Sequence, residues 1–230
     1  MSGMRFAHRI AHRLGIPERR RGQMVDGFHR LYYSSGRQTW KNTRWLGARA
    51  LKTPLDLWIY QELLVALLPA LIIETGTAEG GSALFLASIC QLLGRGEVIT
   101  VDTETRERPR HSRITYLTGS STSPETLAAV AERAQDKSPV MVLLDSDHDR
   151  DHVLAELRSY ADFVTPGSYL VVEDTNLNDH PVVSGFGPGP MEAVEEFLRE
   201  RDDFEPDPSA EKFLLTFNPR GYLRRKFSDS

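Results

Sequence analysis

The sequence predicts an α/β fold built on a doubly wound, mostly parallel sheet with an antiparallel edge strand and an N-terminal helical arm. From residue 53 onward, short β-rich runs alternate with longer helical patterns, as in parallel strands joined by helical crossovers. The runs Val140–Leu144 and Tyr169–Val172 are continuously apolar, which is typical of strands covered by helices on both faces. The 230 residues correspond to one domain with an appendage.

Residues 1–52 are predicted to form the arm, because they are basic and carry scattered aromatic residues. Residues 1–50 contain eleven Lys and Arg against two acidic residues, whereas residues 51–230 contain seventeen against thirty. A basic arm can contact nucleic acid or an anionic membrane. The run of arginines at 19–21 has neither interleaved aromatic residues nor a base-reading motif, so nucleic-acid binding is disfavoured and contact with a protein partner is expected.

The elements of the sheet domain, residues 53–230, follow in order. A helix begins after Thr53, a capping residue, with Pro54 at its first position, and ends before Pro69. An extended piece at 204–207 is expected to pair with the last strand as an antiparallel hairpin. We expect strands at 71–75, 97–102, 113–117, 140–145, 168–174 and 212–217, and helices at 81–93, 124–134, 151–163 and 191–201.

The composition is that of a soluble globular protein, with 40% apolar and 26% charged residues. The longest apolar stretch, 63–73, is interrupted by Pro69 and is too short to cross a bilayer. Arginine rather than an apolar segment follows the first residues, which argues against a secretory signal. The single cysteine, Cys90, excludes an intramolecular disulfide, and a cytoplasmic location is therefore predicted.

A turn of small residues after the first strand of the sheet is a candidate nucleoside site. Ligands of open α/β sheets bind at the carboxyl ends of the strands, where small residues allow close approach of the backbone. An acid at the end of the next strand can accept hydrogen bonds from ribose hydroxyls. The pattern also fits a degenerate dinucleotide-binding turn, or a tight turn without a ligand. The candidate cofactor-binding residues are Glu74, Gly76, Thr77, Gly80, Ser82, Asp102 and Ser120.

Acidic residues at the ends of two later strands form a candidate metal site. Asp145 ends the fourth strand, and Glu173 and Asp174 end the fifth. If these strands are neighbours, three carboxylates converge, and hard oxygen donors suit Mg²⁺ or a similar divalent cation. Solvent-facing or capping acids are the alternative, which we favour for the single residues Asp147, Asp149 and Asp151.

His148 follows Asp145 by three residues and is the candidate general base. An imidazole on the loop leaving this strand can face the cavity with a suitable pKa. Asp145 is assigned to the catalytic set together with His148. His152 follows at helical spacing, and a structural role is favoured for it because the surrounding carboxylates suit a hard cation better than zinc.

These residues resemble the cephalosporin-hydroxylase-like methyltransferases, relatives of the macrolide-sugar and rhamnosyl O-methyltransferases of natural-product pathways. The resemblance extends from about Asn42 to Tyr222. It is carried by the segments 42–47, 55–62, 73–77, 80–85, 144–148 and 172–175.

The resemblance implies a Rossmann-like class I fold, an S-adenosylmethionine-binding catalytic domain over residues 53–230 and a homo-oligomer, which we expect to form through the arm. It also implies a divalent cation, Mg²⁺ or a similar hard cation, held by Asp145, Glu173 and Asp174, with His148 as the base. The expected reaction is O-methylation of a hydroxyl group of a sugar or other intermediate, as in antibiotic biosynthesis. No membrane association is expected. Iron oxygenase chemistry is not supported, because no facial triad of two histidines and a carboxylate is found.

Three other functions stay open on the residues alone. A catechol-type O-methyltransferase would share both sites, an NAD-linked oxidoreductase would need no acidic trio, and a non-catalytic assembly protein would use the basic arm. The segment 176–190, rich in Gly and Pro, is either a substrate loop or a structured connection.

Overall fold

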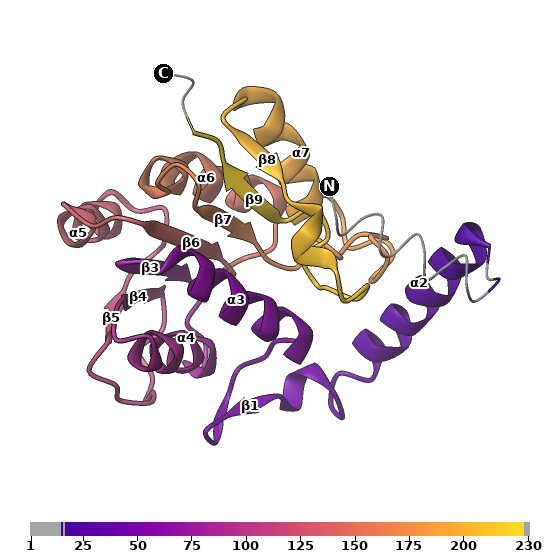
Figure 1. Ribbon diagram of the computed structural model, residues 1–230, viewed down its shortest axis with the longest axis horizontal. Coiled ribbons are helices and arrows are strands. Elements are labelled where there is room, and N and C mark those ends of the chain that lie inside the picture. The colour runs from indigo at the N-terminus through magenta and orange to yellow at the C-terminus, as the bar shows by residue number, and fades with distance from the viewer. Residues whose placement is uncertain (1–14, 16, 228–230) are drawn as a thin grey trace.

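The computed structural model describes residues 15 and 17–227, and a seven-stranded sheet lies at its centre (Figure 1). The order of the strands is β5-β4-β3-β6-β7-β9-β8. Neighbours from β5 to β7 are parallel, whereas β9 is antiparallel to both β7 and β8. The predicted mostly parallel sheet with an antiparallel edge is therefore confirmed. The strands are β3 (Leu71–Thr75), β4 (Glu97–Asp102), β5 (Ile114–Thr118), β6 (Val140–Leu144), β7 (Tyr169–Val172), β8 (Phe204–Pro206) and β9 (Tyr222–Arg225).

Helices cover both faces of the sheet, which explains why its central strands β3 and β6 are buried at every position. Alternate residues of a strand point to opposite faces. Leu71 and Ile73 of β3 accordingly join one hydrophobic cluster, and Ile72 joins the other. The first cluster packs under α5 (Pro124–Ala134), α6 (Arg150–Tyr160) and α7 (Pro190–Glu200), and the second under α3 (Pro54–Leu67) and α4 (Gly81–Leu92).

The prediction of a final strand at 212–217 is wrong, and the last strand is β9. A short 3₁₀ helix, η3 (Pro208–Glu211), precedes this segment, and Leu214 has a φ of 71°. Leu215 and Phe217 are buried, as in a strand, which explains the error. The backbone N–H of Phe217, however, donates to the carboxylate of Asp56 instead of to a neighbouring strand. The extended piece at 204–207 does form an antiparallel edge, with β9 as its partner.

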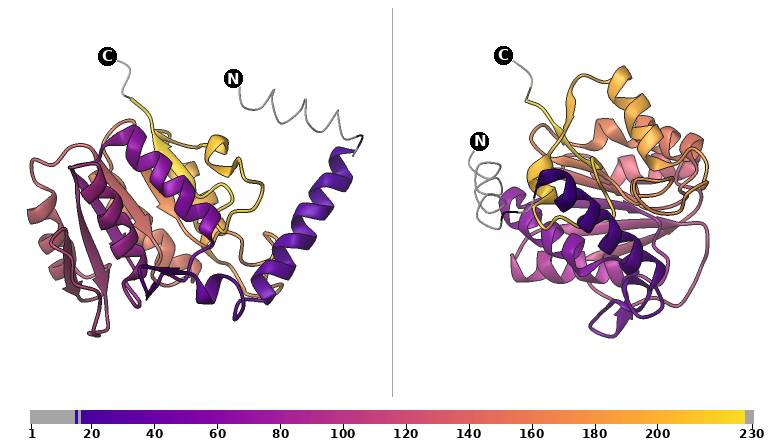
Figure 2. Two further views of the ribbon diagram at one scale, coloured as in Figure 1. Left: turned by 60° about the horizontal axis from the view of Figure 1, so that its bottom comes forward. Right: turned by 90° about the vertical axis from the view of Figure 1, so that its right-hand side faces the viewer.

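The described part of the predicted arm consists of α2 (Glu18–Ser34), η1 (Trp40–Asn42) and a hairpin of β1 (Arg44–Trp45) and β2 (Ala48–Arg49). Helix α2 projects away from the sheet (Figure 2). The hairpin instead packs on α4, where Trp45 Nε1 donates to Ser88 Oγ at 3.1 Å and its ring meets Phe85 edge-on. Residues 1–14 and 16 of the predicted arm lie outside the described residues.

Over the described ranges, 15 and 17–227, no helix combines the length and the apolar character that a membrane span requires.

Candidate active site

The turn between β3 and α4 lies against the end of β6. Gly76 has a φ of 84°, and a Cβ added there would be 1.7 Å from the carbonyl oxygen of Asp145. Only glycine fits this crossing. Gly80, with a φ of 77°, is the N-cap of α4, and Thr77 Oγ1 lies 2.7 Å from Thr100 Oγ1. The turn therefore brings the N-terminus of α4 to the carboxyl edge of the sheet, where the sequence predicted a nucleoside site.

Glu74 is a buried carboxylate with one oxygen left without a partner. Its Oε2 accepts a hydrogen bond from Thr100 Oγ1 at 2.6 Å, whereas Oε1 has no hydrogen-bond partner among the described residues. Burial raises the pKa of Glu74, while Lys52 and the buried Ser82 hydroxyl in the first turn of α4 oppose that shift. A buried oxygen without a partner calls for a polar group to satisfy it. This environment fits a polar ligand at the turn.

Asp102 ends β4 as predicted, but protein groups contact its carboxylate. Oδ2 accepts from the Ala78 N–H at 2.8 Å and lies 3.0 Å from Arg108 Nη2. Arg108 also donates from Nε to the Ala78 carbonyl at 3.0 Å, so the segment after β4 folds back over the turn. Ser120 is exposed beyond β5, where its Oγ lies 3.3 Å from Thr122 Oγ1. Within the described residues, no hydrogen bond joins the Ser120 side chain to the turn.

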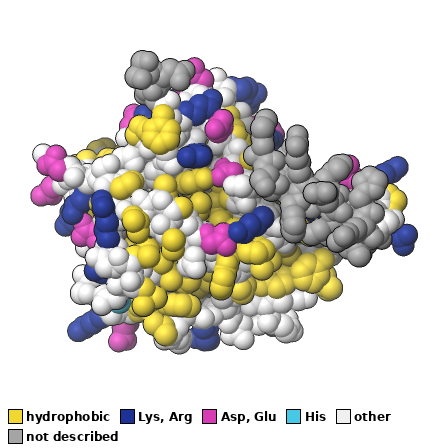
Figure 3. All heavy atoms as spheres, in the orientation of Figure 1, with side chains coloured by type: hydrophobic (Ala, Val, Ile, Leu, Met, Phe, Trp, Pro, Cys, Tyr) yellow, Lys and Arg dark blue, Asp and Glu magenta, His cyan; other side chains and the backbone are white. Residues whose placement is uncertain are grey.

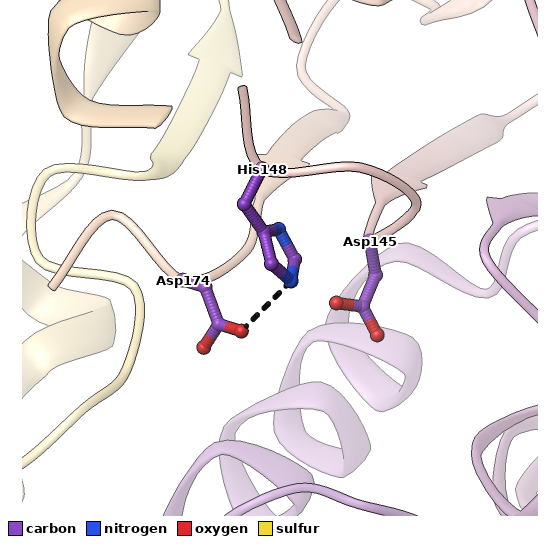
Figure 4. Close-up of side chains that lie close together, drawn as sticks. All are labelled: Asp145, His148 and Asp174. Atoms are coloured by element: carbon purple, nitrogen blue, oxygen red, sulfur yellow. Dashed lines mark ion pairs between the residues drawn. The ribbon is translucent and has the colours of Figure 1, made fainter. Parts of the chain in front are cut away.

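Asp145, His148 and Asp174 converge where β6 and β7 end (Figure 4). These strands are adjacent and parallel, so the residues that follow them meet at one edge of the sheet. His148 Nε2 lies 3.1 Å from Asp174 Oδ2. One ligand atom from each of the three side chains lies within 4.8 Å of the other two. Two carboxylates and an imidazole are donors that divalent cations accept.

Glu173 is next to this group but is paired with Lys52 in the protein interior. Lys52 Nζ lies 2.5 Å from Glu173 Oε2 and 2.7 Å from Asp145 Oδ2. The side chains of Lys52 and Glu173 are only 3% and 7% exposed. Glu173 Oε1 has no hydrogen-bond partner among the described residues. Glu173 is thus not one of the three converging donors, and its role as a metal ligand stays a prediction.

The excess of negative charge shifts the pKa values of the site. Burial alone would lower the pKa of His148, but Asp174, Asp145 and Glu173 raise it to about 9. Burial also raises the pKa of Asp145, which Lys52 lowers and Asp174 raises further. The pKa of Glu173 is raised well above its usual range by burial and by Asp145, against the opposing effect of Lys52. A buried site with surplus carboxylates favours an added cation.

The other acidic and histidine residues near β6 stabilise local structure. Asp149 is the N-cap of α6 and accepts from the Asp151 N–H at 2.9 Å. Asp147 accepts from the Asp149 N–H at 3.0 Å. His152 Nε2 lies 3.0 Å from Ser146 Oγ. These contacts agree with the structural roles that the sequence analysis favoured for Asp149 and His152.

The loop after Asp174 is held against α2. His29 Nε2 lies 3.0 Å from Asn176 Nδ2, and Arg30 donates from Nε to the Pro181 carbonyl at 2.9 Å. The His29 ring stacks on Phe217 with a centroid distance of 5.7 Å, and burial lowers the pKa of His29 to about 4. Helix α2 is therefore anchored at its C-terminal half to the active edge of the sheet.

A cavity of about 770 Å³ lies between this loop, α2 and η1. Tyr33 and Trp40 stack in its wall with a centroid distance of 5.2 Å. The pKa of Tyr33 is raised to about 12, by burial and by Asp174. Other lining residues are Arg30, Arg37, Lys41, Pro181 and Val183.

The sheet order, the turn after β3 and the acidic edge of β6 and β7 define the class I, Rossmann-like methyltransferase fold. Solved structures of CmcI have this fold. The form with Mg and SAM gives a TM-score of 0.65 at 21% identity, with 81% of this chain and 78% of that chain covered. The apo form gives a TM-score of 0.64 at 22% identity, covering 82% and 78%.

The family is shown by sequence. The family model Rhamnosyl O-methyltransferase/CmcI matches residues 37–226. The rhamnosyl O-methyltransferase of Mycobacterium leprae (strain TN) is 40% identical over 220 residues, covering 92% of this chain and 95% of the relative. That of Mycobacterium bovis (strain BCG / Pasteur 1173P2) is 40% identical over 211 residues, covering 88% and 85%. The chain belongs to the Rhamnosyl O-methyltransferase/CmcI family, and the predicted enzyme class, O-methyltransferase, is confirmed.

Sequence reasoning missed Lys52 and Arg108 because lysine and arginine are usually exposed. Both side chains are nearly buried here, at 3% and 5% exposure. The position of Lys52, one residue before the helix cap Thr53, was the available signal, since the start of α3 is fixed by that cap.

Proposed function

We propose that this protein is an S-adenosylmethionine- and Mg²⁺-dependent O-methyltransferase that methylates a hydroxyl group of a sugar or related natural-product intermediate. The observation that carries the proposal is the joining of two features at one edge of the sheet. The backbone of Gly76, in the turn after β3, lies directly against Asp145, the first residue of the cation-binding group. A donor bound at the turn and a hydroxyl held at the cluster would be neighbours.

The donor set fits a divalent cation. Asp145 and Asp174 offer carboxylate oxygens within 4.8 Å of one another, and Glu173 Oε1 adds a buried oxygen without a partner among the described residues, which leaves His148 as the base. Oxygen-rich sets of this kind suit Mg²⁺. CmcI, which shares the fold, has been solved with Mg and SAM.

The turn fits S-adenosylmethionine. The N-terminus of α4 is surrounded by the predicted residues Glu74, Gly76, Thr77, Gly80 and Ser82. Glu74 Oε1 has no hydrogen-bond partner among the described residues and can accept from a polar group of the ligand. Asp102 would accept the ribose hydroxyls once Arg108 yields one carboxylate oxygen. Ser120, whose side chain bonds to Thr122 and not to the turn, is the weakest member of the predicted set.

Bound S-adenosylmethionine would supply a sulfonium methyl group, and a bound divalent cation would supply positive charge beside the acceptor oxygen. His148 performs the proton transfer: its imidazole accepts the hydroxyl proton as the oxygen takes the methyl group from the sulfonium, giving a methyl ether, S-adenosylhomocysteine and an imidazolium. Asp174, 3.1 Å from Nε2, orients the ring and stabilises the imidazolium that results. Positive charge between Asp145 and Asp174 would lower the pKa of His148 from about 9, which leaves its nitrogen free to accept.

The cavity between α2, η1 and the loop that follows Asp174 supports a sugar acceptor. Tyr33 and Trp40 give it an aromatic wall, and Arg30, Arg37 and Lys41 give it hydrogen-bond donors for hydroxyl groups. Aromatic faces with a few polar groups are typical of small-molecule sites.

Mass spectrometry of products tests the proposal. Rhamnosides, other glycosides, polyketides and catechols are incubated with S-adenosylmethionine, with Mg²⁺ or with EDTA. We expect the mass of a glycoside to increase by one CH₂ when Mg²⁺ is present and to stay unchanged in EDTA. Methylation of catechols alone, or undiminished methylation in EDTA, contradicts the proposal.

The base assignment has its own variant. We expect His148→Asn to lower kcat by about 10²–10⁴-fold while S-adenosylhomocysteine still binds, because a positioned base contributes that much. His111→Asn, whose Nδ1 only accepts from the Arg113 N–H before β5, is the matched control and should keep its rate. An unchanged kcat in the His148 variant would reject the assignment.

A further inference from the structure

Lys52 is the least expected residue of the site. Its side chain is 3% exposed, and its ammonium contacts two carboxylates, at 2.5 Å from Glu173 and 2.7 Å from Asp145. Glu74 is a third acid close enough to act on it: burial alone would lower the pKa of Lys52, but Asp145, Glu173 and Glu74 together raise it. A buried lysine with this many acidic neighbours is a permanent cation.

The backbone holds Lys52 in place from both sides. Thr53, the next residue, is the N-cap of α3, and its side chain accepts from the Leu55 N–H. Before it, the carbonyl of Arg49 crosses so close to Gly81 that a Cβ there would be 2.1 Å from the oxygen. The segment that carries Lys52 is thus fixed between the first turns of α3 and α4, and the ammonium cannot easily leave the carboxylates.

Each carboxylate uses only one oxygen for Lys52. The ammonium binds Asp145 Oδ2 and Glu173 Oε2, whereas Glu173 Oε1 has no hydrogen-bond partner in the described part of the chain. Asp174 and His148 each offer a ligand atom within 4.8 Å of one on Asp145. The lysine thus uses one oxygen of each carboxylate, and Glu173 Oε1 is left for a second positive charge.

We propose that Lys52 is a positioning residue, a fixed internal cation that holds the carboxylates of Asp145 and Glu173 side by side before a divalent cation binds. Without it, the buried carboxylate of Glu173 and the neighbouring, partly exposed carboxylate of Asp145 repel one another and lack a counter-charge. Since removal of one partner leaves a buried charge unpaired, it costs much more than removal of both. The inference rests on the proposed function in one respect: it takes the position of the divalent cation from the proposed metal site.

A double-variant cycle in metal-free protein tests this role, with urea unfolding in EDTA as the readout. We expect Lys52→Met to lower the folding equilibrium constant by about 10²-fold or more. Adding Glu173→Gln removes one unpaired charge, so the double variant should regain at least about tenfold. If Lys52→Met does not fold at all, folding of the double variant gives the same support.

The matched control is the surface pair of Lys137 and Glu97, which are 2.6 Å apart with side chains 40% and 45% exposed. Lys137→Met and its double variant with Glu97→Gln should each stay within about threefold of the wild type. A role of Lys52 in packing alone predicts that the two changes add. The proposal is overturned if the double variant Lys52→Met/Glu173→Gln is no more stable than Lys52→Met alone. It is also overturned if the double variant is unfolded while the single variant Glu173→Gln folds.

Metal titration separates this inference from the proposed function. If a divalent cation and Lys52 neutralise the same carboxylates, Mn²⁺ should raise the urea midpoint of Lys52→Met by more than that of the wild type. An equal or smaller rise contradicts a shared set of carboxylates. No rise in any variant overturns the metal site of the proposed function and leaves the double-variant cycle to decide the role of Lys52.

Discussion

His148 links the chemistry of the site to its stability through its ionisation. Its pKa is raised from 6.5 to about 9, with Asp174 as the largest favourable influence against burial. A group whose pKa is raised on folding stabilises the protein fully below its unfolded pKa, and this contribution is lost as the pH rises through the folded value. In metal-free protein, His148 should therefore stabilise the fold at pH 6 and contribute little at pH 10.

Urea unfolding in EDTA from pH 6 to pH 10 checks this expectation. His148→Asn should be less stable than the wild type at pH 6, and the two stability curves should approach each other between about pH 6.5 and pH 9. A constant difference over the whole range would show that the ion pair with Asp174 does not set the charge of His148.

Asp56 ties α3 to the segment that replaced the predicted last strand. Its carboxylate accepts hydrogen bonds from Thr216 Oγ1 at 2.5 Å, the Phe217 N–H at 3.0 Å and the Tyr222 hydroxyl at 2.9 Å. Burial raises its pKa to about 6 against the opposing effect of these bonds. The hydrogen bonds fix the ring of Phe217 against His29, and through it they join the sheet to the helix that flanks the cavity.

Removal of this carboxylate should be costly. Asp56→Ala leaves three buried donors without their acceptor, and at about 1–3 kcal/mol for each we expect a loss of at least about 3 kcal/mol in the free energy of unfolding. Urea denaturation measures it. Glu132→Ala on α5, with a side chain 81% exposed, should change stability by less than about 0.5 kcal/mol. A loss for Asp56→Ala as small as that of the control would mean that α3 does not hold the 216–222 segment.

Elements with a strong local pattern could be predicted from the sequence, and those defined by distant contacts could not. The runs that became β6 and β7 are apolar throughout, and the cap residue Thr53 marks a helix start that the structure confirms. The prediction of a strand at 212–217 was wrong because the buried residues there bond to a distant side chain instead of to a neighbouring strand. Asp56, 160 residues from Thr216, accepts from its hydroxyl and from the Phe217 N–H. Burial alone does not distinguish a strand from a loop held by side chains.

The same limit applies to the site. Asp145, His148 and Asp174 follow strand ends, so the topology of the sheet was enough to bring them together. Lys52 and Tyr33 come from the predicted arm, and their place depends on how that arm crosses α4 and the 176–184 loop. A division at residue 52 stays a prediction, although the arm supplies side chains to the active edge.

Across the part of the chain that the structure describes, helix α2 is an element that projects from the sheet and carries an apolar face. Met24, Phe28 and Leu31 of α2 follow helical spacing and are 56%, 55% and 62% exposed. A second apolar surface covers α3 and α4, where hydrophobic side chains gather in the face shown in Figure 3, and Val65 of α3 is 51% exposed. Exposed apolar patches on soluble proteins often mark contacts with other chains.

The predicted homo-oligomer through the arm can be tested by choosing between these surfaces. Light scattering coupled to size exclusion should give a multiple of the chain mass for the wild type. Phe28→Asp/Leu31→Asp should give the mass of one chain with an unchanged melting temperature, because both side chains are exposed in the isolated chain. Val65→Asp on α3 is the control and should keep the assembled mass. A monomeric wild type, or dissociation by the α3 variant alone, contradicts the arm as the interface. If the dissociated variant also loses methyl transfer, the acceptor cavity beside α2 depends on assembly for its activity.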